Sequence, residues 1–67
     1  MNKLQLKELK QALIRESAGK SAEYVALVKG SQAVVFPADR ETRYKHYIRK
    51  GYIHMMSALD GDVLPLY

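Results

Sequence analysis

Hydrophobic positions near the start of the chain recur at helical spacing. Leu6, Leu9 and Leu13 stand at i, i+3 and i+7, and Asn2 is placed to cap the first turn. The pattern predicts a helix from about residue 3 to 17, with a leucine stripe that packs on a core.

The next two segments have the composition of strands. Residues 22–28 and 32–36 are rich in β-branched and aromatic residues, and Lys29-Gly30-Ser31 between them has turn chemistry, so we predict a β-hairpin. Both faces of this hairpin are largely apolar. Either two helices wrap most of it, or its second face or an open edge meets another subunit, and we favour the second interpretation.

Residues 39–59 admit two interpretations. Pro37 ends the second strand and Asp39 can cap a helix that begins after it. We favour one long amphipathic helix to about residue 59, with Gly51 on its packed face, because seven positions share one stripe at the helical period. These are Tyr44, Tyr47, Ile48, Gly51, Met55, Ala58 and Leu59.

In the alternative interpretation the second helix ends at Lys50, Gly51 is its C-terminal cap, and residues 52–56 form a third strand. In both interpretations Asp60-Gly61 ends the helix or strand that precedes it. The favoured interpretation predicts an α+β fold in which two antiparallel helices pack on a two-stranded β-hairpin, in the order α-β-β-α. The predicted core comprises Leu6, Leu9, Leu13, Val25, Leu27, Val34, Phe36, Tyr47, Ile48 and Met55.

The end of the chain is predicted to lie outside the domain. We expect one small domain over residues 1–61 and an apolar tail over residues 62–67, which Pro65 prevents from continuing as a helix. A chain that stops after Asp62 is expected to keep its fold and melting temperature and to lose assembly with a partner. The predicted partner-docking residues are Val63, Leu64, Leu66 and Tyr67.

Composition narrows the class of protein. With 67 residues, 48% of them hydrophobic, the chain is long enough for one thin core, and the absence of cysteine excludes a disulfide. No apolar stretch is long enough to span a membrane, and Lys3, Lys7 and Lys10 interrupt any apolar signal segment, so we expect synthesis in the cytoplasm. Oligomerisation is a route by which so small a domain gains stability.

Candidate chemistry is sparse. Gly19-Lys20-Ser21 is similar to the end of a phosphate-binding loop, but Ile14 stands where that loop needs another glycine. His46 and His54 lie on the polar side of the predicted long helix without a nucleophile or carboxylate placed to complete a catalytic set. We therefore predict no catalytic residue, no cofactor and no metal, and a protein that is not an enzyme.

Charge is sorted on the second helix. The net charge is +4, and Arg43, Lys45, His46, Arg49 and Lys50 spread over the face opposite the aromatic stripe. Arg43, Lys45, Arg49 and Lys50 are the predicted contacts to a polyanion or to an acidic protein surface, with weak and non-specific DNA binding by the isolated chain. The alternative is that this helix face is only solvated and binds no partner.

The order helix, Gly-Lys, hairpin, long helix and tail resembles the small head-to-tail joining protein of lambda-like bacteriophages, the W family. Ala12-Leu13 followed by Gly19-Lys20 resembles the end of that family's first helix. Phe36, Ala38, Lys45 and Tyr47-Ile48 fall at spacings that resemble its second strand and second helix, although the basic run before the family's C-terminus is missing.

The resemblance implies a structural virion protein that forms a homo-oligomeric ring below the portal, retains packaged DNA, and contacts neighbouring portal or adaptor and tail proteins. Its localisation would be the virion, after synthesis in the host cytoplasm. Two other classes stay open. One is a small basic nucleic-acid-binding regulator, and the other is a phage-encoded inhibitor of a host protein.

Overall fold

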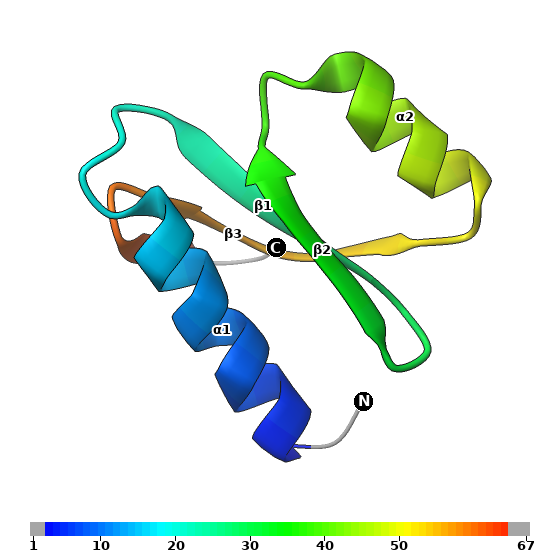
Figure 1. Cartoon of the computed structure of the whole chain (residues 1–67), viewed down its shortest axis with the longest axis horizontal. Helices are drawn as coiled ribbons and strands as arrows, with labels where there is room; N and C mark the ends of the chain where they lie inside the picture. Colours follow the sequence, from blue (N-terminus) through cyan, green and yellow to red (C-terminus); the bar gives the residue numbers. More distant parts are fainter. Residues whose placement is uncertain (1–2, 65–67) are drawn as a thin grey trace.

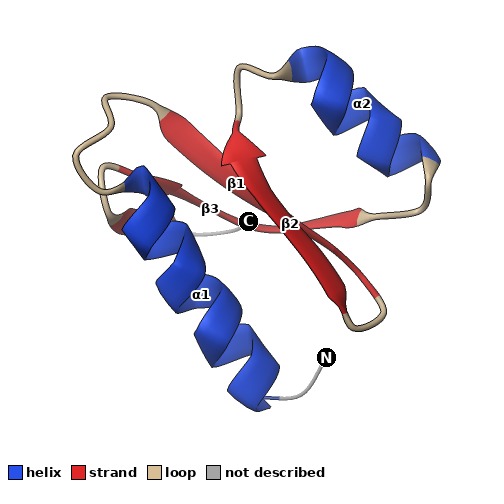
Figure 2. Cartoon of the chain, in the orientation of Figure 1, coloured by secondary structure: helices blue, strands red, loops and turns tan. Residues whose placement is uncertain are grey.

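The computed structural model describes residues 3–64 and contains a single antiparallel sheet of four strands in the order β2-β1-β3-β4 (Figures 1 and 2). The elements in chain order are α1 (Lys3–Ser17), β1 (Glu23–Lys29), β2 (Gln32–Pro37), α2 (Glu41–Arg49), β3 (Ile53–Leu59) and β4 (Asp62–Leu64). The predicted first helix and first hairpin are confirmed. The predicted α-β-β-α fold with a two-stranded hairpin is wrong, because the order is α-β-β-α-β-β.

Strand β1 is the centre of the fold because it is apolar on both faces and paired along both edges. It pairs antiparallel with β2 on one side and with β3 on the other. Val25, Ala26, Leu27 and Val28 are all buried. A strand of this kind needs two neighbours and a cover on each face, and a two-stranded hairpin supplies only one of those neighbours.

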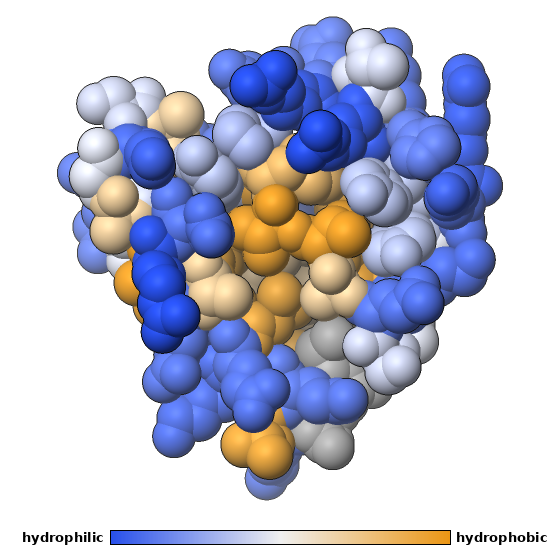
Figure 3. Space-filling model, viewed as in Figure 1, coloured by the Kyte–Doolittle hydropathy of each residue, from blue (hydrophilic) through white to orange (hydrophobic). Residues whose placement is uncertain are grey.

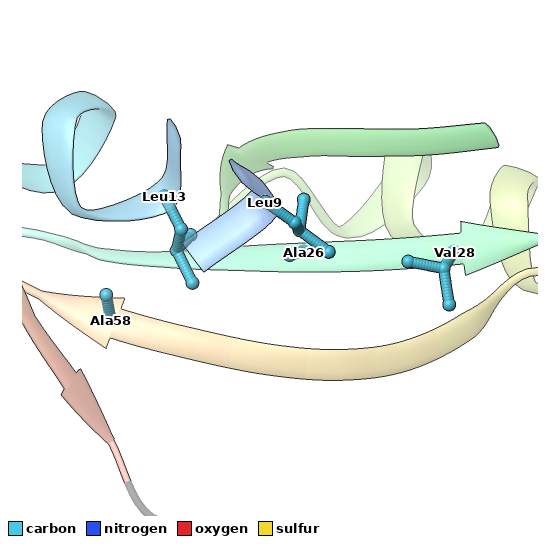
Figure 4. Packing of buried hydrophobic residues seen from close by; sticks show 5 residues of the cluster. All are labelled: Leu9, Leu13, Ala26, Val28 and Ala58. Carbon is cyan, nitrogen blue, oxygen red and sulfur yellow. The ribbon is translucent and has the colours of Figure 1, made fainter. Parts of the chain in front are cut away.

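The two helices cover opposite faces of the sheet, as Figure 1 shows with α1 and α2 on either side of the strands. Under α1, Leu9 and Leu13 pack on Ala26, Val28 and Ala58 (Figure 4). The alternate residues of β1 face the other way, so a second cluster forms under α2. Its buried members are Val25, Leu27 and Phe36. The second apolar face of the hairpin is therefore covered by this chain's own helix, and only an open edge remains for a subunit contact.

Helix α2 ends in a glycine motif that also starts the turn into β3. Gly51 has φ +97°, its N–H donates to the Ile48 carbonyl at 3.0 Å, and the Tyr52 N–H donates to the Tyr47 carbonyl at 3.0 Å. The rings of Tyr47 and Tyr52 pack with centroids 5.0 Å apart. These bonds and this contact make up the Schellman motif. The long helix to residue 59 and the place of Gly51 on its packed face were therefore wrong predictions, and the alternative with Gly51 as a cap is confirmed.

Replacing Gly51 by alanine tests this helix end. The positive φ costs an L-residue about 1–2 kcal/mol, so G51A is expected to lower the free energy of unfolding by that amount. G51N is the matched control. Because asparagine takes left-handed conformations more readily than alanine, this variant should lose less free energy of unfolding. Chemical denaturation followed by circular dichroism measures both. A G51A variant as stable as the parent would contradict the motif.

Asp60 and Gly61, predicted to end the second helix, form the turn between β3 and β4. Both have positive φ, 50° and 85°, as a two-residue type I′ hairpin turn requires. The turn is tied to the end of α1: Asp60 Oδ1 accepts from the Gly19 N–H at 3.1 Å, and the Gly61 N–H donates to Ser17 Oγ at 3.0 Å. Ser17 is fully buried, so this polar contact fixes the β3–β4 hairpin against α1.

The predicted division at residue 61 falls inside that hairpin. Residues 62–64 pair with β3, with Val63 opposite Ala58 and Leu64 opposite Ser57. Val63 and Leu64 are half-buried, and Val63 packs against the cluster under α1. These residues belong to the sheet, whereas Leu66 and Tyr67 lie outside the described residues.

The predicted core is confirmed in its centre and wrong at one position. Leu9, Leu13, Val25, Leu27 and Phe36 are buried. Ile48 is 41% exposed, because α2 is short and turns this side chain away from the sheet. The remaining predicted core residues are half-buried: Leu6, Val34, Tyr47 and Met55.

Candidate polyanion-binding surface

Aromatic side chains hold α2 on the sheet. Tyr44 and Tyr47 are half-buried against the cluster of Val25, Leu27 and Phe36. The rings of Phe36 and Tyr47 are stacked, with centroids 5.9 Å apart and 26° between their planes. The two tyrosines are therefore packing residues, as their place in the apolar stripe predicts, and the opposite side of α2 is left to solvent.

That opposite side carries the predicted cationic residues. Arg43, Lys45, His46, Arg49 and Lys50 are all exposed, and together we call them the basic surface. Within residues 3–64 none of them has a carboxylate oxygen within 4.0 Å of a side-chain nitrogen. The structure thus brings the four predicted contact residues together on α2 and its C-cap residue Lys50. Their charges are not neutralised by ion pairs within the described part of the chain.

A further cation comes from a distant part of the chain. Lys29 Nζ donates to the Lys50 carbonyl at 2.6 Å, across 21 residues of sequence. An ammonium group at a helix C-terminus interacts favourably with the helix dipole and here enlarges the basic surface at that end. From the sequence, Lys29 is predicted only as part of a turn, because nothing local to it shows that the strand register brings it beside α2.

A shallow depression lies at the start of α2. It has a volume of about 890 Å³ and contains charges of both signs. Asp39 and Glu41 lie beside Arg40 and Arg43, so the depression has no strong preference for an anion. Its lining residues are Asp39, Arg40, Glu41, Thr42, Arg43, His46 and Tyr47. Arg40 is the N-cap residue of α2 and makes no side-chain cap hydrogen bond, so the predicted cap at Asp39 is wrong.

A second pocket, of about 460 Å³, lies where α2 meets β1 and β3. His54 lies there, opposite Leu27 in the register of β1 and β3, and was wrongly predicted on the polar side of a helix. Tyr44 Oη lies 3.5 Å from His54 Nδ1, and Nε2 is buried without a hydrogen-bond partner among the described residues. The lining residues are Glu23, Val25, Ala38, Glu41, Tyr44, Lys45 and His54.

This second pocket has acid–base groups but no serine, threonine or cysteine in its lining to act as a nucleophile. Within residues 3–64 no three histidine, aspartate or glutamate side chains are grouped so that they could hold a metal ion. The basic surface is consequently the feature with the clearest chemical preference, namely for negative charge.

No helix of residues 3–64 has the length and apolar character needed to cross a membrane. No protein-family model, curated protein or solved structure matches this chain.

Proposed function

We propose that this chain is a non-catalytic binding module that holds the phosphate backbone of double-stranded DNA on the basic surface of α2. The observation that carries the proposal is the group of five exposed basic side chains on α2 and its C-cap residue Lys50, without ion-pair partners in the described part of the chain. Phosphate groups supply the missing counter-charges, and the release of their condensed ions favours binding.

The geometry supports contact without readout of base sequence. Arg43 and Lys50 are seven residues apart, so they span about 10 Å along a helix that rises 1.5 Å per residue. This length matches a few phosphates. Contacts to phosphates position a protein on a duplex but carry no sequence information. For about four phosphates neutralised, the slope of log K against log salt is about −3.6, so binding weakens about 100-fold between 50 and 200 mM salt.

Two pairs of substitutions of equal charge test the proposal. R43Q/R49Q and K7Q/K10Q each lower the net charge from +4 to +2, the first on the basic surface and the second on exposed positions of α1. Fluorescence anisotropy with a labelled DNA duplex, measured over a salt series, gives the slope for each. We expect R43Q/R49Q to reduce the slope by about 1.8, and K7Q/K10Q to change it much less.

An equal reduction of the salt slope in the two variants would mean that net charge alone attracts DNA, and would contradict a site on α2. A tight complex with one duplex sequence at physiological salt would favour the regulator class and overturn the non-specific mode.

The implied role in a phage virion is not part of this proposal. The resemblance to the joining-protein family rests in part on a long second helix, and strands β3 and β4 occupy residues 53–59 and 62–64 instead. A basic surface that meets DNA is compatible with such a role, but it is equally expected of any protein that binds phosphate backbones.

A further inference from the structure

The outer edge of β2 is an open and uncharged sheet edge. Among the described residues β2 pairs only with β1, and the strand Gln32–Pro37 contains no charged side chain. Proteins usually protect an edge of this length with lysines, inward-pointing charges, bulges or a covering element, because unpaired backbone groups attract another strand. This edge has none of those charges.

The edge is also apolar and accessible. In the view of Figure 1, β2 lies in front between α1 and α2. In the same view, Figure 3 shows a hollowed apolar area between hydrophilic side chains. Ala33 is exposed, and Val34 and Val35 are half-buried although they belong to a strand with helices on both sides. A strand added at this edge would therefore cover apolar side chains as well as backbone groups.

The register shows which backbone groups are free. The Ala38 N–H donates to the Glu23 carbonyl at 2.8 Å, so residue 38 directs its backbone groups toward β1. Alternation along an antiparallel strand then directs Phe36 and Val34 toward β1, and Val35 and Ala33 toward the open edge. Pro37, which has no N–H to donate, falls on an outward position, as an edge proline must.

We propose that this edge binds the β2 strand of a second copy of this chain, in antiparallel register about a two-fold axis that passes beside Val34. Ala33 of one copy then lies opposite Val35 of the other, and each such pair exchanges both of its N–H···O bonds. The two-fold axis produces that pair twice. Val34 lies opposite its own copy in the closer, non-hydrogen-bonded pairing, where β-branched side chains pack well.

Other registers make fewer bonds. A shift of one pairing step toward the C-terminus places Pro37 at a position that needs an N–H. A shift the other way uses Ser31, which lies in the turn between β1 and β2. Since β2 is uncharged, no like charges oppose each other along the shared edge. A second copy is thus complementary to this edge in hydrogen bonding, polarity and charge.

The symmetry of this pairing decides on which side of the dimer the helices lie. The core under α1 is centred on Ala26, Val28 and Ala58 of β1 and β3, and Val35 of β2 packs at its margin. The two-fold axis is perpendicular to the sheet, so the two α2 helices lie on the same face and direct both basic surfaces to one side of the dimer. Each β2 edge is used once, so the assembly closes at two chains.

Sedimentation equilibrium over a concentration series, without DNA, tests the dimer independently of the proposed function. We expect the mass to rise from 7.6 kDa toward twice that value. A33K places a charge on the edge at an exposed position, and Q11K adds the same charge at an exposed position on α1. We expect A33K to raise the dissociation constant about tenfold or more, because symmetry places the charge in the interface twice, and Q11K to leave it nearly unchanged.

A melting temperature for A33K close to that of the parent shows that its monomer is folded. Amide exchange then locates the interface, because the N–H groups of Ala33 and Val35 should exchange more slowly as the protein concentration rises. A mass that stays at one chain at every concentration would overturn the proposal. So would growth beyond two chains, equal effects of A33K and Q11K, or slowed exchange confined to other strands.

Discussion

Truncation of Leu27 to alanine is expected to lower the free energy of unfolding by about 2–5 kcal/mol, the largest effect of any substitution considered. Leu27 is fully buried in the central strand, between Val34 of β2 and His54 of β3 in the register. At about 0.05–0.15 kcal/mol per residue, a chain of this length has roughly 3–10 kcal/mol of total stability. L27A should therefore unfold a substantial part of the protein at room temperature.

The same variant should weaken the proposed DNA binding, although Leu27 is fully buried and cannot reach a phosphate. Leu27 belongs to the cluster on which Tyr44 and Tyr47 of α2 pack. A helix of nine residues is not stable in water on its own, so α2 and its basic surface are ordered only while that cluster is intact. Loss of fold and loss of binding should follow the same temperature dependence.

Urea denaturation followed by circular dichroism measures the change in stability. I53A is the matched control, because Ile53 is of similar size but 66% exposed, and its truncation should change stability by no more than about 0.5 kcal/mol. Similar losses for L27A and I53A would contradict the placement of the core between β1 and α2.

Ending the chain after Asp62 is expected to lower the melting temperature, contrary to the expectation drawn from the sequence. This truncation removes Val63 and Leu64 from β4, where both are half-buried and paired with β3. Half-burial of two aliphatic side chains contributes about 2–3 kcal/mol. In a domain of this size that corresponds to a decrease of about 10–20 °C.

A chain that ends after Leu64 is the comparison for this truncation, since the two chains differ only in Val63 and Leu64. Differential scanning calorimetry of both isolates the contribution of those residues. If the two melt at the same temperature, β4 does not stabilise the sheet, and the expectation of a tail that serves only for docking regains support.

The first helix and the first hairpin could be predicted because their signals are local. The leucines at i, i+3 and i+7 identify α1 whatever it packs on, and the run of β-branched residues around Lys29-Gly30-Ser31 identifies β1 and β2. The four predicted phosphate contacts are also on one exposed helix face, because residues 43–50 are close in sequence. Lys29 could not be included, since its place beside Lys50 depends on the register of strands far along the chain.

Residues 51–64 were misinterpreted because their sequence fits two local patterns, one of a long helix and one of a helix end followed by a hairpin. The stripe from Tyr44 through Met55 to Leu59 fits a helix, while Gly51 followed by an aromatic residue fits a helix end and Asp60-Gly61 fits a hairpin turn. Local free energies do not separate these alternatives, since an interior glycine costs only about 1 kcal/mol. The contacts that separate them join residues far apart in the sequence.

By itself, then, the sequence determined the elements whose stability is set by neighbours within a few residues, together with the sorting of basic and apolar residues along α2. Only the tertiary structure decided that β3 pairs with β1, that the helices take opposite faces, and that β2 has an open edge. The physical reason is the central strand. Val25 to Val28 are apolar on both faces, and burying them requires a second strand neighbour and a helix on each side. The sequence shows that both faces are apolar, but no local pattern shows which elements cover them.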